Sequence, residues 1–133
     1  MDILLYVNDL LEYGLRLRQK IEQITGAGQL AICQEIYRLK DFLLRQRPDI
    51  RIGILCISDE RDLDRLISIE SLFENIFIIL VLPCIDDEII AKGHKLKPRF
   101  FSYADSEFDD VADVLHHLSR VAGTNKFFAG QLA

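Results

Sequence analysis

The residues best suited to chemistry follow short apolar runs. Asn8 and Asp9 come directly after the first such run, and Cys56 lies at the end of the third one, before a polar turn. If the runs are parallel strands, their carboxyl ends meet at one edge of a sheet, and open α/β sheets bind ligands in the crevice outside that edge. A small-ligand site or an enzyme active site there would be bounded by Asn8, Asp9, Cys56, Ile57 and Ser58.

The chain has three cysteines, Cys33, Cys56 and Cys84, and none belongs to a CxxC motif. A cysteine reacts or binds metal as the thiolate, which a neighbouring Lys, Arg or His favours. Cys56 and Cys84 would end neighbouring strands and could form a redox pair, but neither has such a residue beside it in sequence. We therefore expect reduced, mostly buried and unreactive thiols, as is typical of a cytoplasmic protein.

Acidic residues and histidines offer candidate metal ligands. The acidic residues at positions 59, 60, 62 and 64 could hold a cation together with Asp9. An acidic first turn, favoured by the helix dipole, is the simpler reading. His116 and His117 cannot both face one metal along a helix, so a surface position is favoured. We expect no metal site.

The glycines do not form a phosphate-binding loop. Gly26 and Gly28 follow a helical pattern instead of a strand, which favours a turn at a helix end over a dinucleotide loop. The loop after the first apolar run is not rich in Gly, Ser or Thr. We therefore expect no bound cofactor.

Five apolar runs alternate with five amphipathic patterns along the chain. This alternation favours a parallel sheet between two layers of helices, because crossover connections are right-handed. The fourth run shows no polar alternation, which suits a strand covered on both faces. The predicted strands are 3–7, 29–33, 51–58, 77–82 and 99–103, and the predicted helices are 10–24, 36–45, 59–73, 86–93 and 106–123.

Length and composition fit one globular domain. The chain has 133 residues, of which 50% are hydrophobic, and a formal net charge of −5. Because no Lys/Arg-rich block appears, nucleic-acid binding is disfavoured. The longest apolar run, 76–85, is shorter than the roughly 20 residues of a membrane helix. We expect one domain over residues 1–123, a tail over 124–133, and, since no secretion leader is recognisable, a cytoplasmic location.

The layout resembles the receiver domain of bacterial two-component response regulators. Three local features carry the resemblance: the polar Asn8-Asp9 after the first run, Arg47-Pro48-Asp49 before the third, and Phe108-Asp109-Asp110-Val111 at the start of the last helix. The resemblance covers residues 2 to about 123. It implies a flavodoxin-like fold with the strand order 2-1-3-4-5.

The resemblance also implies where a phosphorylation site would lie. In an active receiver, an aspartate at the end of the third strand accepts a phosphoryl group beside a Mg²⁺ ion that an acidic pair helps to hold. In this chain the acceptor position falls on Cys56, and the acidic pair falls on Asn8 and Asp9. A thiol forms no acyl phosphate, and sulfur is a poor ligand for Mg²⁺.

The two remaining positions of the family's set differ as well. The hydroxyl residue falls on Leu82 or Pro83, and the lysine falls on Tyr103 or Ala104. An alternative register takes Lys97 as that lysine and residues 93–96 as the fifth strand. The resemblance therefore implies a degenerate, phosphorylation-independent receiver that is not an enzyme.

Degenerate receivers usually serve as docking or dimerisation modules. The family's interaction face consists of the fourth helix, the fifth strand and the fifth helix, and Tyr103 would lie at its rim. Phe127 and Phe128 in the tail could contact the body or a second subunit. The resemblance thus implies a signalling or adaptor module whose partner is another protein or a second copy of the chain.

Overall fold

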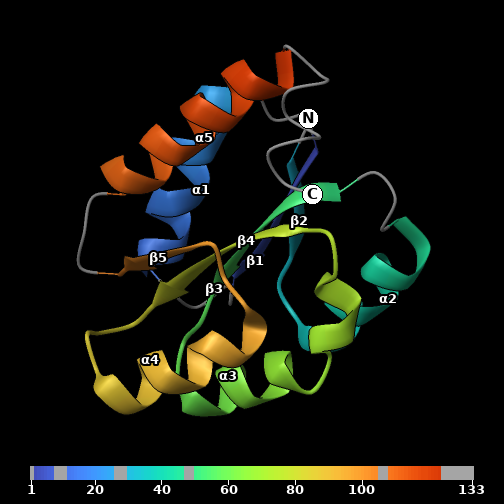
Figure 1. Ribbon diagram of the computed structural model, residues 1–133, viewed down its shortest axis with the longest axis vertical. Coiled ribbons are helices and arrows are strands. Elements are labelled where there is room, and N and C mark those ends of the chain that lie inside the picture. Colours follow the sequence, from blue (N-terminus) through green and yellow to red (C-terminus); the bar gives the residue numbers. More distant parts are fainter. Residues whose placement is uncertain (1, 8–11, 26–29, 47–49, 105–107, 124–133) are drawn as a thin grey trace.

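The computed structural model describes residues 2–7, 12–25, 30–46, 50–104 and 108–123. Five parallel strands form one sheet in the order β2-β1-β3-β4-β5 (Figure 1). The order that the receiver resemblance implied is therefore confirmed. The strands are β1 (Asp2–Val7), β2 (Leu30–Cys33), β3 (Ile50–Cys56), β4 (Phe77–Leu82) and β5 (Phe100–Tyr103).

Helices cover both faces of the sheet. Helices α1 and α5 lie on one face, and α2, α3 and α4 lie on the other (Figure 1). This arrangement is the three-layer flavodoxin-like fold. The helices are α1 (Glu12–Thr25), α2 (Ile36–Gln46), α3 (Glu60–Ile67), α4 (Asp87–Gly93) and α5 (Asp109–Gly123), with short 3₁₀ helices η3 (Glu70–Phe73) and η4 (His94–Leu96).

Strand β3 lies at the centre of the sheet and contributes to both cores. Ile54 packs with residues of α1 and α5, whereas the next residue, Leu55, packs with residues of α2 and α3. Both side chains are completely buried. Side chains alternate between the two faces of a strand, so a strand covered on both sides needs an unbroken apolar run. This requirement explains the uninterrupted run in β3.

The third helix is shorter than predicted. It ends at Ile67, and Phe73, expected on the same helix, belongs to η3. After α3 the hydrogen bonds change to 3₁₀ spacing: the Ile69 N–H donates to the Leu66 carbonyl at 3.1 Å, and the Leu72 N–H donates to the Ile69 carbonyl at 3.0 Å. The helix therefore stops, and the 3₁₀ turn brings Phe73 back into the core.

The alternative register for the fifth strand is wrong. Residues 93–96 belong to the end of α4 and to η4, and Lys97 follows in a left-handed conformation with φ of 53°. The Arg99 N–H then donates to the Ile78 carbonyl at 2.8 Å, which aligns the chain for β5. Lys97 thus precedes the fifth strand and lies at the amino edge of the sheet.

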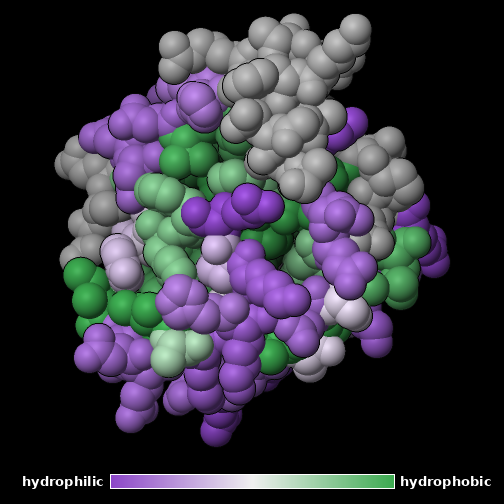
Figure 2. All heavy atoms as spheres, viewed as in Figure 1, coloured by the Kyte–Doolittle hydropathy of each residue, from purple (hydrophilic) through white to green (hydrophobic). Residues whose placement is uncertain are grey.

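The described surface is mixed in character. Hydrophilic side chains cover much of the face shown in Figure 2, with apolar side chains visible between them. His116 and His117 are exposed, as predicted. None of the helices in the described ranges is long and apolar enough to cross a membrane. Among the residues that the structure describes, four large hydrophobic side chains are exposed: Leu15, Tyr37, Leu44 and Ile85.

Candidate functional site

The predicted site lies at the carboxyl edge of the sheet. Strands β3 and β4 pair Cys56 with Val81, and β4 and β5 pair Leu82 with Tyr103. The structure therefore brings three predicted positions, Cys56, Leu82 and Tyr103, to one edge, and Pro83 follows at the end of β4. The other predicted positions lie outside the described residues: Asn8, Asp9, Phe127 and Phe128.

Cys56 is part of the core. Its side chain is 0% exposed and packs in the cluster beneath α1 and α5. Burial raises the pKa of the Cys56 thiol to about 12. The hydrogen bond with the Tyr13 hydroxyl lowers this pKa, but by less than burial raises it. The proton therefore stays on the sulfur at neutral pH. A buried neutral thiol is neither a nucleophile nor a metal ligand.

Tyr13 covers the end of β3 from α1. Its hydroxyl donates a hydrogen bond of 2.6 Å to the Ile57 carbonyl, immediately beyond the strand. Burial is the main cause that raises the pKa of Tyr13, so the hydroxyl remains a donor. The Ile57 N–H in turn donates to the Val81 carbonyl at 3.0 Å. The backbone groups that leave β3 are thus satisfied within the protein.

A buried carboxylate holds the turn between β3 and α3. The Asp62 side chain is only 3% exposed and accepts three hydrogen bonds. The Tyr6 hydroxyl donates at 2.5 Å, the Ser58 N–H at 3.1 Å and the Ser58 hydroxyl at 3.3 Å. A buried carboxylate needs such donors because it has lost its hydration. This cluster of Tyr6, Ser58 and Asp62, here called the Asp62 network, connects β1, the turn and α3.

The Asp62 network also keeps the Tyr6 hydroxyl protonated. Burial, followed by the hydrogen bond to Asp62, raises the pKa of Tyr6 well above the ordinary tyrosine value. The phenol therefore stays protonated across the physiological range. Its proton is directed at Asp62, so the hydroxyl acts as a structural donor.

The acidic residues after β3 have separate roles. Asp59 caps α3 by accepting from the Asp62 N–H at 2.9 Å. Glu60 and Asp64 instead form ion pairs with Lys92 of α4, at 2.7 and 3.1 Å. Within the described ranges, no group of three or more His, Cys, Asp or Glu residues is placed to hold a metal ion. The acidic residues that cluster in sequence thus have three different roles. Asp59 caps α3, Asp62 is buried, and Glu60 and Asp64 pair with Lys92 at the surface.

The cysteines differ from one another in exposure. Cys33 and Cys56 are buried, as predicted, but Cys84 is exposed, so that part of the prediction is wrong. Cys84 follows Pro83 beyond the end of β4, where the chain leaves the sheet, and the neighbouring Ile85 is 71% exposed. The apolar run 76–85 therefore continues three residues beyond the end of β4 at Leu82.

Sequence reasoning missed the Asp62 network. Its local signal was the pair Asp59 and Asp62, three positions apart at a helix start, which is the spacing of a capping box. The partner Tyr6 lies 56 positions away on β1. Only the folded sheet brings the Tyr6 hydroxyl to Asp62.

A second long-range polar contact was also missed. Ser102 on β5 is completely buried, and its hydroxyl bonds to a carboxylate oxygen of Asp110 at 3.1 Å. The Ala104 N–H, just beyond β5, donates to the Leu82 carbonyl at 2.8 Å. These bonds fasten the start of α5 and the end of β5 beside the Tyr103 position.

We predict that the thiols differ sharply in reactivity. At neutral pH, iodoacetamide should modify Cys84 rapidly and Cys56 only as fast as the protein opens, because burial keeps the Cys56 thiol protonated. Peptide mass spectrometry of timed samples would measure both rates. Cys84→Ser should abolish the fast reaction, whereas Cys56→Ser should leave it unchanged. Equal rates at the two thiols would contradict the buried position of Cys56.

Comparisons of the chain with protein-family models, with curated proteins and with solved structures give no match. The flavodoxin-like fold therefore rests on the sheet order and the helical layers. The resemblance to receiver domains rests on the layout of the chain and on the segments 8–9, 47–49 and 108–111, and it stays a prediction.

Proposed function

We propose that the chain is a receiver-like signalling or adaptor module that acts through protein contacts and without phosphorylation at the end of β3. The observation that carries this proposal is the completely buried Cys56 at the acceptor position. An acyl phosphate forms when an accessible carboxylate oxygen attacks the phosphorus atom in line with the leaving group. A protonated thiol inside the core offers neither the oxygen nor the access.

The surroundings of Cys56 support the same conclusion. Asp62 is a carboxylate on α3, but its two oxygens are occupied by Tyr6 and Ser58. Accepting a phosphoryl group would break this network and require the buried side chain to turn outward. The position of the family's hydroxyl residue carries Leu82 or Pro83, which have no hydroxyl. The position of its lysine carries Tyr103 or Ala104, which have no positive charge to neutralise a phosphoryl group.

The rival hypothesis, a small-ligand or enzyme site in the crevice, receives less support from the described residues. Cys56 and Ile57 are completely buried, and the Tyr13 hydroxyl is bonded to the Ile57 carbonyl. Of the crevice residues that the structure describes, Ser58 alone is partly exposed, and its hydroxyl is directed at Asp62.

The proposed contact face consists of α4, β5 and α5. Ile85 is 71% exposed just before α4, and Ile89 and Ile90 of α4 are half-buried. On β5, Tyr103 is half-buried and Phe101 meets the His94 ring edge-on, with ring centroids 5.0 Å apart. Apolar and aromatic side chains at a rim are typical of protein interfaces. We propose that a second copy of the chain binds here.

We predict that acetyl phosphate with Mg²⁺ does not phosphorylate the protein. Intact-mass spectrometry should show no added phosphoryl group, because the acceptor position holds a buried thiol. The amide NMR signals of Cys56, Ile57 and Ser58 should not shift. An active receiver domain treated in parallel provides the positive control. Stoichiometric phosphorylation that hydroxylamine removes would identify a phosphoaspartate and overturn the proposal.

We also predict that the chain self-associates through the α4–β5–α5 face. Light scattering should report a dimer for the unmodified chain and a monomer for Ile85→Glu, because the new charge would be buried in the interface. Leu15→Glu, which changes an exposed apolar residue on α1, is the matched control and should remain dimeric. A monomer at every concentration would refute self-association through this face.

A further inference from the structure

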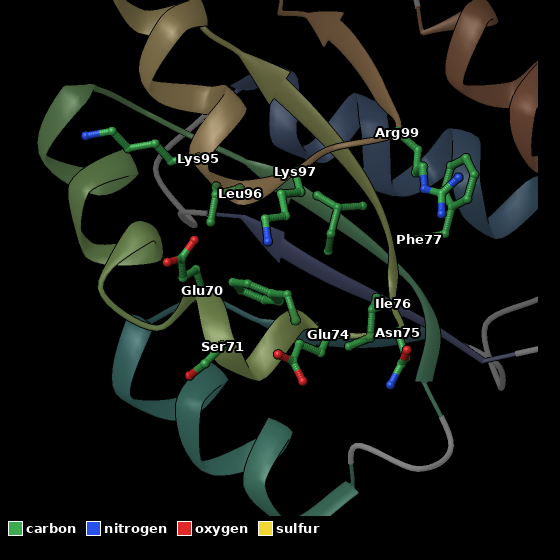
Figure 3. A pocket seen from close by; sticks show the side chains of 12 residues that line it. Glu70, Ser71, Glu74, Asn75, Ile76, Phe77, Lys95, Leu96, Lys97 and Arg99 are labelled. Carbon is green, nitrogen blue, oxygen red and sulfur yellow. The ribbon is translucent and has the colours of Figure 1, made fainter. Parts of the chain in front are cut away.

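A groove of about 500 Å³ lies at the opposite, amino edge of the sheet (Figure 3). It is formed by η3 and the turn into β4 on one side, and by η4 and the segment leading into β5 on the other. Phe73, Ile76 and Leu96 supply buried apolar surface to it. A second hollow of about 540 Å³ shares Glu74, Asn75 and Ile76 with the first and extends toward α2. The two hollows adjoin at residues 74–76, and together they are called the groove.

Cations outnumber carboxylates around the groove, although the chain as a whole is acidic. Four cations line it, Lys95, Lys97 and Arg99 in the first hollow and Arg51 in the second, against the carboxylates Glu70 and Glu74. The chain as a whole carries a formal net charge of −5. None of the four cations forms an ion pair with another residue of the described ranges.

The backbone holds these cations in defined places. The Lys97 N–H donates to the His94 carbonyl at 3.0 Å, and the Arg99 N–H donates to the Ile78 carbonyl. Figure 3 shows the Lys97 side chain directed into the groove, Arg99 beside Phe77, and Lys95 directed away. Lys97 and Arg99 are therefore placed to meet an anionic group that lies over the apolar floor.

The shape of the groove favours an extended chain over a small molecule. Pockets for small molecules usually enclose most of the ligand surface. Here most of the polar lining is exposed, and the second hollow reaches Leu44, whose side chain is 63% exposed. A segment lying along the groove would cover this apolar surface and place its charges beside the cations.

We propose that the groove binds an acidic, apolar segment of a partner protein. Its carboxylates meet Lys97, Arg99 and Arg51, and its apolar side chains pack on the floor at Phe73, Ile76 and Leu96. The groove lies at the edge of the sheet opposite Cys56. This proposal is therefore independent of the function proposed above.

An NMR titration with defined probes tests the proposal. The probe is a short synthetic peptide of Glu, Leu and Ser, compared with the same peptide carrying Lys in place of Glu, and with inorganic phosphate. The acidic peptide should cause saturable shifts in the amides of residues 70–78 and 95–99. Added salt should weaken its binding, because exposed charges are screened. The basic peptide and phosphate should cause no saturable shifts there.

Charge variants show which cations contribute to binding of the acidic peptide. Lys97→Asn removes the charge with a residue that tolerates the left-handed conformation, and Arg99→Glu provides a second variant at a strand position. Each should raise the Kd for the acidic peptide about tenfold. Arg61→Glu, an exposed position on α3, is the matched control and should leave the Kd unchanged. Thermal unfolding would establish that each variant is folded.

Four results would overturn the proposal. Equal binding of the basic peptide would show that only apolar contact matters. Saturation by phosphate at similar concentrations would show a site for small anions. Shifts outside the groove, or no shifts at millimolar acidic peptide, would show that the groove does not bind it.

Discussion

The carboxyl edge of the sheet depends on one buried charge. Removing a carboxylate from water costs several kcal/mol unless hydrogen bonds replace the lost hydration. Asp62 meets this requirement with the Tyr6 hydroxyl and with both donors of Ser58. Because the donors come from β1 and from the turn after β3, the three segments must keep their places. On the other face of the sheet, Cys56 is buried in the core beneath α1 and α5, where the Tyr13 hydroxyl bonds to the Ile57 carbonyl.

The two edges of the sheet consequently have different characters. At the carboxyl edge, the polar groups that the structure describes around β3 are directed at one another. At the amino edge, Lys97 and Arg99 face solvent beside apolar surface and have no ion-pair partner among the described residues. This difference is the basis for the two proposals of protein contacts made above.

Much of the architecture was predictable from the sequence because it follows from periodicity. Unbroken apolar runs marked the central strands, and amphipathic patterns marked the helices between them. Errors arose where tertiary contacts decided the outcome. The apolar pattern of α3 continues at Ile69 although the helix has changed to 3₁₀ bonding there, and Cys84 extends an apolar run beyond the end of β4. The contact between Tyr6 and Asp62 joins residues 56 positions apart, and the groove joins the segments 70–78 and 95–99; neither leaves a local pattern.

Asp62 acts as a structural group that holds β1, the turn after β3 and α3 together at the carboxyl edge of the sheet. A double-mutant cycle with Tyr6→Phe and Asp62→Ala tests it most directly, by measuring the free energy of unfolding of the four proteins in urea. Because the hydroxyl donates to a buried carboxylate, we predict a coupling free energy of about 1.5–3 kcal/mol. A coupling near zero would show that the two side chains do not stabilise each other, and would contradict the account of a closed, structural carboxyl edge.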